Sequence, residues 1–402
     1  MNITIAPCTL KGSVAAPPSK SLAHRMLICA ALARGVSLIR GIGESEDVLA
    51  TVACLRQLGA EIRLENGNAE VRGGVPEEPA GTETVFDCGE SASTLRFMIP
   101  VATALRERCL FTGEPGLLRR GIGGYEALLA KQGIRLTTED RGFRTEGRLQ
   151  GGKLTVPGDL SSQYTTGLML ALPLIAGEHE LQVLAPRVSV PYTRMTAKVM
   201  EDFGADIREN GDGVWQISGG TGYQARETEV EGDWSGAAVY FALNSLGHEI
   251  RVTGLDPDSL QGDRVCTRLL AELEDGDPTV DVTDCPDLAP VLFAAAAAKH
   301  GALFTGTGRL AGKESDRVRC MTSELAKFGV RSAITEDTVR IMPERVKRPT
   351  EALEGHGDHR IVMALSILCV LTGGTLRGTE AVGKSYPRFF EDLERLGLRI
   401  EG

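Results

Sequence analysis

A pattern with a period of about 70 residues recurs along this chain of 402 residues. Each copy reads as an amphipathic helix, then a glycine, then two short strands joined by a polar turn. The four fuller copies and a shortened fifth copy occupy residues 53–73, 127–147, 198–220, 323–343 and 392–402. A recurring pattern of this length indicates repeated subdomains. The simpler alternative is a set of unrelated amphipathic helices that are each followed by a hairpin.

The glycine of each copy suits the left-handed position that follows the last turn of many helices. These glycines are Gly59, Gly133, Gly204, Gly329 and Gly397. The wide interval between the third and the fourth leaves room for one more, degenerate copy that ends near residues 269–277. Because a period above ~50 residues is long for a solenoid, we expect six small α/β subdomains, grouped into one or two layered α/β bodies.

Composition narrows the classes of function. The formal net charge of −10 argues against a general nucleic-acid binder or a binder of anionic membranes. The first residues, MNITIAPCTLKGS, do not resemble a secretion signal, and the apolar runs are shorter than the ~20 residues of a membrane span. The nine cysteines form no C-x-x-C pair. We therefore expect a cytoplasmic protein whose cysteines pack as small hydrophobic side chains.

Seven short segments are rich in glycine, hydroxyl side chains and cations, although the fourth has no cation. They are residues 17–25, 88–97, 113–121, 160–166, 312–317, 357–360 and 383–390. At the start of a helix such a segment presents free backbone N–H groups to an anion. In 17–25 the serines are candidate N-caps, and Arg25 lies one turn from Ser21. In an acidic protein, seven such segments predict a small and highly anionic substrate held between subdomains.

Residues 378–385 match the phosphate-binding P-loop pattern G-x-x-x-x-G-K-[ST]. Tyr386 and Pro387 interrupt the turn into a helix, and too few residues follow for the further strands of a nucleotide-binding domain. We therefore expect Lys384 to bind an anion without forming a nucleotide site.

Candidate acid–base groups are few. Of the six histidines, only His359 lies between a carboxylate and a guanidinium. Asp287 precedes an apolar helix, where it would either cap the helix or act chemically. Glu314 is flanked by Lys313 and Arg317, which would keep it ionised or simply pair with it at a solvated helix start. No His, Cys and Asp cluster has metal spacing, so we expect no metal site.

Together these motifs resemble the enolpyruvyl transferase family, and within it the 5-enolpyruvylshikimate-3-phosphate synthases, along essentially the whole chain. The motifs are PSKSxxxR, STLR, GEPxxxxR, SSQY, VPY, DxPDLAP, KESDR, DHR and KSYPxFFEDLxxLG, in family order. The resemblance implies an α/β fold of two lobes, each of three βαβαββ-type units. It implies a lobe of residues 19–229, a lobe of residues 1–18 plus 230–402, and an active site in the cleft between them.

The resemblance also implies an activity that needs no metal or organic cofactor. The enolpyruvyl group of phosphoenolpyruvate (PEP) would pass to the 5-hydroxyl of shikimate 3-phosphate, and phosphate would leave. The implied catalytic residues are Asp287, Glu314, Lys20 and His359. The implied PEP contacts are Lys20, Ala92, Arg120, Gln163, Arg317, Arg360 and Lys384. The implied contacts to shikimate 3-phosphate are Lys20, Ser21, Arg25, Ser161, Ser162, Gln163, Ser189, Asp287 and Lys313.

The chain departs from the common family pattern at three places. Glu90-Ser91-Ala92 stands where many members have Asn-Ala-Gly, Gly121 where proline is common, and Arg309 where asparagine often contacts shikimate phosphate. Ala92 either favours the start of a helix or narrows the PEP site against glyphosate, the longer PEP-competitive inhibitor of this family. Whether Arg309 contacts the substrate is left open.

Three alternative functions are kept. The UDP-N-acetylglucosamine enolpyruvyl transferases share the fold and the donor, but they use a cysteine where residues 113–124 have none, and asparagine where Ser21 stands. A P-loop ATPase and a non-catalytic anion-binding relative are the other two. The intact set of Lys20, Asp287, Glu314 and Lys384 argues against the last. We expect a stand-alone monomer of bacterial type.

Overall fold

The structure is a computed structural model, and it describes residues 1–76, 81–274 and 276–401. The chain divides into two compact bodies. The N-terminal body is Pro18–Glu231, where the sequence analysis expected 19–229, and the C-terminal body is Met1–Pro17 with Gly232–Gly402. Each body has its own hydrophobic core. Within the described ranges, no helix has the length and apolar character needed to cross a membrane.

The second repeat of the N-terminal body shows the common plan. Its elements are β6 (Thr84–Asp87), α3 (Ala92–Leu105), β7 (Arg108–Thr112), α4 (Pro115–Arg120), α5 (Gly123–Lys131), β8 (Arg135–Glu139) and β9 (Gly142–Glu146). The strand β6 pairs in parallel with β7, while β9 pairs antiparallel with both β7 and β8. The order of the sheet is therefore β6-β7-β9-β8. A parallel crossover through a helix, followed by a hairpin, is the βαβαββ unit that the resemblance implies.

The third repeat follows the same plan. Its elements are β10 (Lys153–Val156), α6 (Ser162–Ala171), η1 (Leu172–Leu174), β11 (Gly177–Val183), α7 (Val190–Asp202), β12 (Ile207–Glu209) and β13 (Val214–Gly219). Its sheet has the order β10-β11-β13-β12, which matches the second repeat strand for strand.

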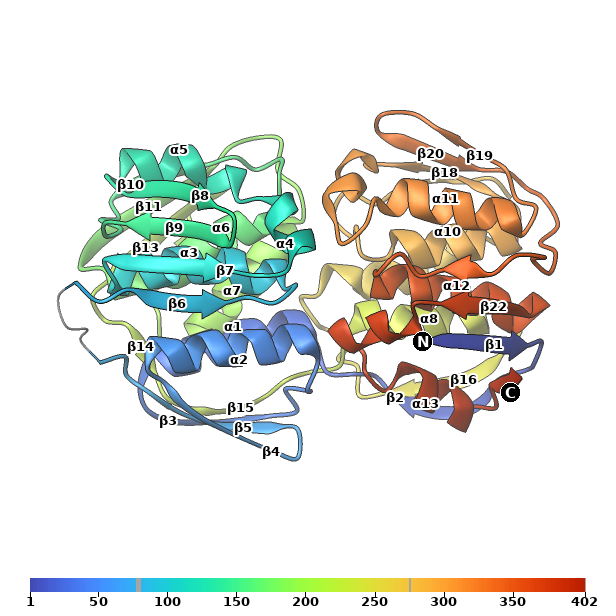
Figure 1. Ribbon diagram of the computed structural model, residues 1–402, viewed down its shortest axis with the longest axis horizontal. Helices are drawn as coiled ribbons and strands as arrows, with labels where there is room; N and C mark the ends of the chain where they lie inside the picture. Colours follow the sequence, from blue (N-terminus) through green and yellow to red (C-terminus); the bar gives the residue numbers. More distant parts are fainter. Residues whose placement is uncertain (77–80, 275, 402) are drawn as a thin grey trace. The chain divides into compact units, whose positions relative to one another are not determined.

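The sheet of the first repeat is completed by strands from the last residues of the N-terminal body. Its own elements are α1 (Lys20–Leu32), β3 (Ala33–Arg40), α2 (Glu46–Leu58), β4 (Glu61–Glu65) and β5 (Asn68–Gly73). The short strands β14 (Tyr223–Gln224) and β15 (Glu227–Glu229) pair in parallel with β3. In Figure 1, α1 and α2 lie over the sheet of β3, β5 and β4. The end of this body thus completes its first sheet.

The fifth repeat, in the C-terminal body, repeats the same order. Its elements are β17 (Thr279–Asp281), α10 (Ala289–Ala298), β18 (Ala302–Thr305), η3 (Gly308–Gly312), α11 (Arg317–Lys327), β19 (Ser332–Ile334) and β20 (Thr338–Ile341). Its sheet runs β17-β18-β20-β19.

The sixth repeat is completed by the N-terminus of the chain. Its elements are β21 (Leu353–Glu354), α12 (His359–Thr372), β22 (Gly374–Arg377), η4 (Thr379–Lys384), α13 (Phe389–Arg395) and β23 (Arg399–Glu401), joined by β1 (Asn2–Ala6). The strand β1 pairs antiparallel with both β22 and β23, so the order is β21-β22-β1-β23. The N-terminal strand therefore belongs to the C-terminal body (Figure 1).

The fourth repeat is the degenerate one. It contains β2 (Lys11–Ala15), α8 (Trp234–Asn244), β16 (Glu249–Thr253), η2 (Gly262–Val265) and α9 (Cys266–Glu272). Its sheet is the parallel pair β16-β2, and no hairpin lies among the described residues between α9 and β17. The six sheets of the described chain confirm the predicted α/β fold of six units.

The glycines that mark the repeats have the predicted backbone conformation. Gly59, Gly133, Gly204, Gly329 and Gly397 have φ angles of 113°, 74°, 83°, 83° and 107°. At Gly59 a Cβ atom would also lie 2.5 Å from Cδ of Pro76. Glycine is needed there both for the left-handed turn and for the close approach.

The first helix of each repeat lies in the core, and the second lies nearer the surface. All the residues of α10 from Ala289 to Ala297 are buried, and so are all those of α12 from His359 to Val370. In contrast, α11 buries only one face. All nine cysteines are free thiols, and seven of them are buried, as expected for small hydrophobic side chains.

Candidate functional site

The candidate residues gather where the buried first helices begin. In the N-terminal body, Lys20 and Ser21 open α1, Ala92 opens α3, and Ser162 opens α6 after its N-cap Ser161. In the C-terminal body, Asp287 precedes α10, and His359 opens α12. Helix N-termini carry partial positive charge and free N–H groups, so these ends are suited to anions.

The ammonium group of Lys20 is held by a residue that the sequence analysis missed. Its Nζ lies 2.6 Å from Oδ2 of Asp47, and the two side chains are only 14% and 10% exposed. Asp47 lies in the first turn of α2. A first-turn acid usually serves its own helix, so the pairing with Lys20 requires knowledge of how α1 packs on α2.

Arg25 is almost fully buried and is held by neutral acceptors. Its Nε donates to Thr196 Oγ1 (2.8 Å), its Nη1 donates to Ser21 O (2.7 Å), and its Nη2 donates to Thr166 Oγ1 (3.3 Å). Its guanidinium lies over the ring of Phe97, 5.1 Å from the centroid. Burial lowers the pKa of Arg25 to about 10, so it remains a cation at neutral pH. None of its hydrogen-bond partners in the described chain is a carboxylate.

Gln163 is fixed in one amide orientation. Its Oε1 accepts a hydrogen bond from Nη1 of Arg96 (2.6 Å), and its Nε2 donates to Ser93 Oγ (2.9 Å). The guanidinium of Arg96 also stacks over the ring of Tyr164 at 4.9 Å. The two hydrogen bonds of Gln163 link the start of α6 to the start of α3. Arg96 lies in the quoted STLR segment, but its role depends on a contact between two repeats.

Arg120 lies next to the turn before α3. Its Nη2 donates to the backbone oxygen of Glu90 (2.7 Å). Ala92 is the first residue of α3, and its N-cap Ser91 accepts a hydrogen bond from the backbone N–H of Thr94. Gly121 ends α4 with a φ angle of 65° and open space around its Cα. The structure therefore brings Arg120 and the Ala92 turn together.

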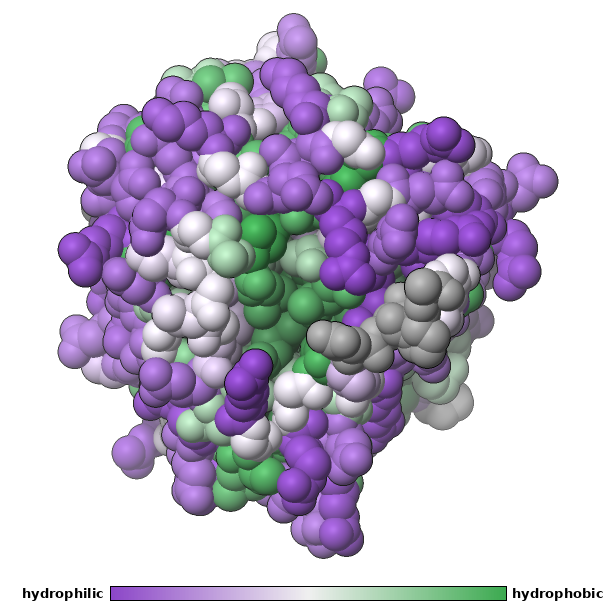
Figure 2. All heavy atoms as spheres, turned by 90° about the vertical axis from the view of Figure 1, so that its left-hand side faces the viewer, coloured by the Kyte–Doolittle hydropathy of each residue, from purple (hydrophilic) through white to green (hydrophobic). Residues whose placement is uncertain are grey.

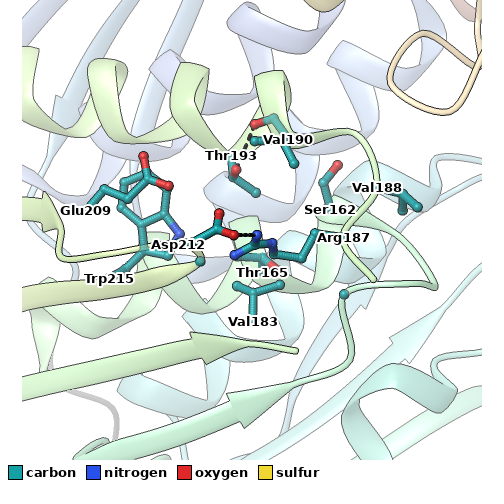
Figure 3. Close-up of a pocket in the computed structure, with 12 residues that line it drawn as sticks. Ser162, Thr165, Val183, Arg187, Val188, Val190, Thr193, Glu209, Asp212 and Trp215 are labelled. Carbon is teal, nitrogen blue, oxygen red and sulfur yellow. Dashed lines mark hydrogen bonds and ion pairs between the residues drawn. The ribbon is translucent and has the colours of Figure 1, made fainter. Parts of the chain in front are cut away.

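The candidate serines near α6 and α7 lie at helix starts, and one of them, Ser162, lines a small pocket. Ser161 caps α6 by accepting from Gln163 N, and Ser189 is the N-cap residue of α7 in a left-handed conformation. Ser162 lines a pocket of about 20 Å³ in which Arg187 reaches Asp212 (Figure 3). That volume suits about one water molecule. A shikimate ring does not fit inside it.

A larger hollow lies at the opposite ends of the same helices. Figure 2 shows hydrophobic side chains gathered in a hollow on one face of the N-terminal body. A pocket of about 330 Å³ is lined by Leu32 and Leu105, which end α1 and α3, and by Leu174, which ends η1. Helix C-termini repel anions. The pocket is also lined by one cation, Arg34, but by none of the candidate site residues.

In the C-terminal body, Arg317 gathers three carboxylates. Its Nη1 donates to Asp287 Oδ1 (2.6 Å), its Nη2 to Glu314 Oε2 (2.8 Å), and its Nε to Asp358 Oδ2 (2.9 Å). Lys313 Nζ adds a fourth contact, to Asp287 Oδ1 at 3.2 Å. The Arg317 side chain is 1% exposed. Asp358 also caps α12 through the N–H of Arg360, and its role as an anchor for Arg317 was not predicted.

The cations of this cluster keep Asp287 ionised. Burial by itself would raise the pKa of Asp287, but Lys313, Arg317 and Arg360 hold it well below its usual range. Burial would likewise lower the pKa of Arg317, but Asp358, Glu314 and Asp287 raise it well above its usual range. The side-chain hydrogen bonds of Asp287 go to Arg317 and Lys313, so the alternative of a helix cap is wrong.

The remaining candidates lie at the start of α12. His359 is the first residue of α12, and its side chain is 2% exposed. Arg360 is buried, and its Nε has no hydrogen-bond partner in the part of the chain that the structure describes. Lys384 Nζ donates to Gly357 O at 2.6 Å. Residues 379–384 form the short helix η4 and not a phosphate loop, which confirms that the P-loop match is accidental.

A model of the family "EPSP synthase (3-phosphoshikimate 1-carboxyvinyltransferase)" matches residues 5–393 of this chain. A 3-phosphoshikimate 1-carboxyvinyltransferase of Clostridium kluyveri is 36% identical over 99% of this chain and 98% of its own length. Another 3-phosphoshikimate 1-carboxyvinyltransferase, from Clostridium perfringens, is 35% identical over 100% of this chain and 99% of its own length. Among solved structures, EPSP synthase from Acinetobacter baumannii superimposes with a TM-score of 0.80 at 25% identity, covering 100% of this chain and 99% of that one.

Proposed function

Because this chain belongs to the EPSP synthase family and carries 3-phosphoshikimate 1-carboxyvinyltransferase activity in the shikimate pathway, we propose the following roles for its residues. The substrates are PEP and shikimate 3-phosphate. The cations of the N-terminal body and the cation–carboxylate cluster of the C-terminal body act on these same two molecules.

The main contact of shikimate 3-phosphate is Arg25, which binds its phosphate group. This buried cation has only neutral hydrogen-bond partners in the described chain, so an arriving phosphate supplies the missing negative charge. Hydroxyl groups and one further cation surround the rest of this ligand: Ser21, Ser161, Ser162, Ser189 and Lys313. Gln163 contacts both substrates, and its amide orientation, fixed by Arg96, directs its NH₂ group toward the side of Ser93.

PEP binds to Lys20 and Arg120 beside the Ala92 turn, and to Arg360 and Lys384 from the start of α12. Arginine is suited to this role because its guanidinium binds phosphate and carboxylate with two parallel hydrogen bonds. Arg317 also contributes to PEP binding, through the one Nη1 hydrogen that its three carboxylates leave unused.

Asp287 accepts the proton of the 5-hydroxyl as that oxygen attacks C2 of PEP. Glu314 carries the proton that PEP gains at its methylene carbon and later loses, Lys20 stabilises the charge on the leaving phosphate, and His359 supports the proton transfers. A carboxylate with so low a pKa is a weak base. Anionic substrates that bind Lys313 and Arg360 would weaken their hold on Asp287 and raise its pKa toward a useful value.

The observation that carries these roles is the group of Asp287, Glu314 and Arg317, in which a buried guanidinium donates to both carboxylates and Asp287 lies just before the buried helix α10. The test is release of phosphate from PEP in the presence of shikimate 3-phosphate, beside a parallel reaction with UDP-N-acetylglucosamine. We expect turnover with the first acceptor only. Loss of that turnover in Asp287→Asn, with PEP binding retained, supports the base role. Unchanged turnover in this variant overturns it.

We also propose that the protein is a cytoplasmic monomer. Nine free thiols fit a reducing compartment. The mass of one chain is 42.9 kDa. Sedimentation velocity of the purified protein should therefore give a single species of about that mass. A species of twice that mass at assay concentration contradicts the monomer.

A further inference from the structure

Four side chains from three helices form a continuous buried chain of hydrogen bonds in the N-terminal body. His24 Nδ1 lies 2.7 Å from Thr51 Oγ1, and Thr51 Oγ1 lies 2.7 Å from Thr94 Oγ1. Thr94 Oγ1 donates to Ser91 Oγ at 2.8 Å. The chain thus runs from α1 through α2 to the N-cap of α3. His24, Thr51, Thr94 and Ser91 are each at most 1% exposed.

Both ends of this chain of hydrogen bonds lie next to residues that are assigned above to PEP binding. His24 lies one helical turn after Lys20, and Ser91 immediately precedes Ala92. Thr94 Oγ1 also lies 3.4 Å from the backbone oxygen of Asp47, whose carboxylate binds Lys20, so the middle of these hydrogen bonds lies near the Lys20 ion pair. The sequence analysis assigned none of these four residues as a ligand contact, and the proposed mechanism does not use His24.

The direction of the chain follows from the number of hydrogens available. Each threonine hydroxyl has one hydrogen to donate. Because Thr94 donates to Ser91, it must accept from Thr51, and Thr51 must then accept from His24. This requires a hydrogen on Nδ1 of His24. The reverse direction would place that hydrogen on Nε2, which is buried with no hydrogen-bond partner in the described ranges. An unsatisfied buried N–H is costly, so the first direction is favoured.

The surroundings also keep this imidazole neutral. Burial, together with the nearby charges of Lys20 and Arg25, lowers the pKa of His24 well below its usual range. The ring packs edge-on to Phe97, with the two ring centroids 6.2 Å apart. A neutral histidine with one defined hydrogen can hold a hydrogen-bond chain in a single direction at any pH near neutrality.

We propose that His24 is a positioning residue: its Nδ1–H sets the direction of the chain through Thr51 and Thr94 and so holds the Ser91–Ala92 turn in the geometry that binds PEP. This inference rests on the PEP-binding role proposed for Lys20 and Ala92. It assigns His24 no contact with substrate.

The first test reads the tautomer directly in the ligand-free protein. In a protein labelled with ¹⁵N-histidine, the two ring nitrogens give distinct signals according to which of them carries hydrogen, and the His24 signals are identified by their loss in His24→Asn. We expect hydrogen on Nδ1 only. Hydrogen on Nε2, or on both nitrogens, at neutral pH overturns the inference whatever the substrate roles are.

The second test separates positioning from general support of the fold. Asn places an N–H donor at the position of Nδ1, whereas Leu fills similar space with no donor. We expect His24→Leu to raise KM for PEP about three- to tenfold, the loss of about one hydrogen bond, with KM for shikimate 3-phosphate within about twofold. His24→Asn should restore KM for PEP. Equal values for the Asn and Leu variants, or an equal rise of both KM values, overturn the inference.

A third variant checks that the effect of His24→Leu does not come from misfolding. A fourth separates this inference from the proposed function. Thr51→Val interrupts the chain without changing His24 and should reproduce the KM pattern of His24→Leu. Lys20→Met is the reference for the PEP site. If His24→Leu and Thr51→Val leave KM for PEP unchanged while Lys20→Met raises it, the inference fails and the proposed PEP site stands. If Lys20→Met also leaves it unchanged, both fail.

Discussion

Two buried candidate arginines, Arg25 in the N-terminal body and Arg317 in the C-terminal body, have opposite kinds of hydrogen-bond partner. Arg25, in the N-terminal body, is 2% exposed and donates to two threonine hydroxyls and to backbone oxygens. Arg317, in the C-terminal body, is 1% exposed and donates to three carboxylates. Burial lowers the pKa of Arg25 to about 10, whereas the carboxylates raise the pKa of Arg317 well above its usual range.

The contrast shows two uses of a buried cation. A buried charge with neutral partners is costly unless an ion of opposite charge arrives, so the proposed role of Arg25 is to bind an anionic ligand. A buried charge that is already matched by carboxylates is a scaffold, and we infer that Arg317 holds Asp287 ionised and keeps Asp287 and Glu314 in place. By this reasoning the N-terminal body contributes more to binding, and the C-terminal body more to proton transfer.

The largest effect is expected at Asp287. Asp287→Asn removes the proposed base while it keeps the shape of the side chain, and kcat should fall by ~10²–10⁴-fold. KM for PEP should not rise, because Lys313 and Arg317 lose a carboxylate that competes with PEP for them. Steady-state kinetics of phosphate release measure both constants. Asp277→Asn, which alters an exposed carboxylate paired with Arg340, is the matched control. A rise in KM with unchanged kcat would assign Asp287 to binding.

The scaffold role of Arg317 predicts a large loss of stability. Arg317→Met removes the buried cation that three carboxylates share, and breaking such a buried pair typically costs ~3–5 kcal/mol in the free energy of unfolding. Arg340→Met, which breaks one exposed ion pair, should cost less than about 1 kcal/mol. Urea unfolding of both variants at neutral pH measures the difference. Equal losses would mean that Arg317 is no scaffold.

The same variant has a pH signature with a defined sign. In the native protein the pKa of Asp287 is depressed, so its contribution to stability is present at neutral pH and is lost as the pH falls through the depressed value. In Arg317→Met this contribution of Asp287 is smaller at neutral pH, and in both proteins it disappears as the pH falls below the ordinary carboxyl pKa of about 4. The loss of stability in Arg317→Met should therefore be largest at neutral pH and shrink as the pH falls from about 5 toward 3. Growth of that loss toward acid would contradict the assignment.

The ligand-binding role of Arg25 predicts an effect that depends on substrate. Arg25→Met should weaken the binding of shikimate 3-phosphate about 10- to 100-fold, since hydrogen bonds to a charged group contribute ~1.5–3 kcal/mol. The ligand-free protein should keep its free energy of unfolding, because Thr166 and Thr196 hydrogen-bond to each other at 3.0 Å. Titration calorimetry and urea unfolding test both statements. A large loss of stability without ligand would make Arg25 a structural residue.

The smallest effect concerns shape rather than charge in the N-terminal body. Ala92 begins α3 and is 8% exposed. If its methyl group crowds glyphosate, Ala92→Gly should lower the inhibition constant of glyphosate about tenfold, at the lower end of the ~1–3 kcal/mol typical of overpacking. KM for PEP should stay within about twofold. Equal inhibition of both proteins would leave helix propensity as the reason for alanine.

Several features of the fold follow from local rules and were predicted from the sequence. The left-handed glycines at the ends of the outer helices are one example, because φ near +60° to +110° is costly for residues with a Cβ atom. The six repeats are another, since each rests on a helical period and a hairpin. The degenerate fourth repeat was predicted as well, from the spacing between Gly204 and Gly329.

Other features depend on contacts between segments that are distant in sequence. The resemblance, and no local pattern, implied that β1 joins the C-terminal body, and β1 does pair with β22 and β23 there. The partners of the candidate residues were not predicted. Asp47 binds Lys20 and Arg96 binds Gln163 across repeat boundaries, where spacing along the chain says nothing about distance in space.

The sequence by itself determined the repeat plan, the chemistry of the anion-binding segments and the family, because these depend on residue type and local spacing. The tertiary structure alone decided how each charge is used. Arg25 and Arg317 both read as cations beside a helix start, and only the packing of α6 and α7 around the first, and of three carboxylates around the second, distinguishes them. The physical reason is that the cost of a buried charge depends on its neighbours in space, not on its neighbours in the chain.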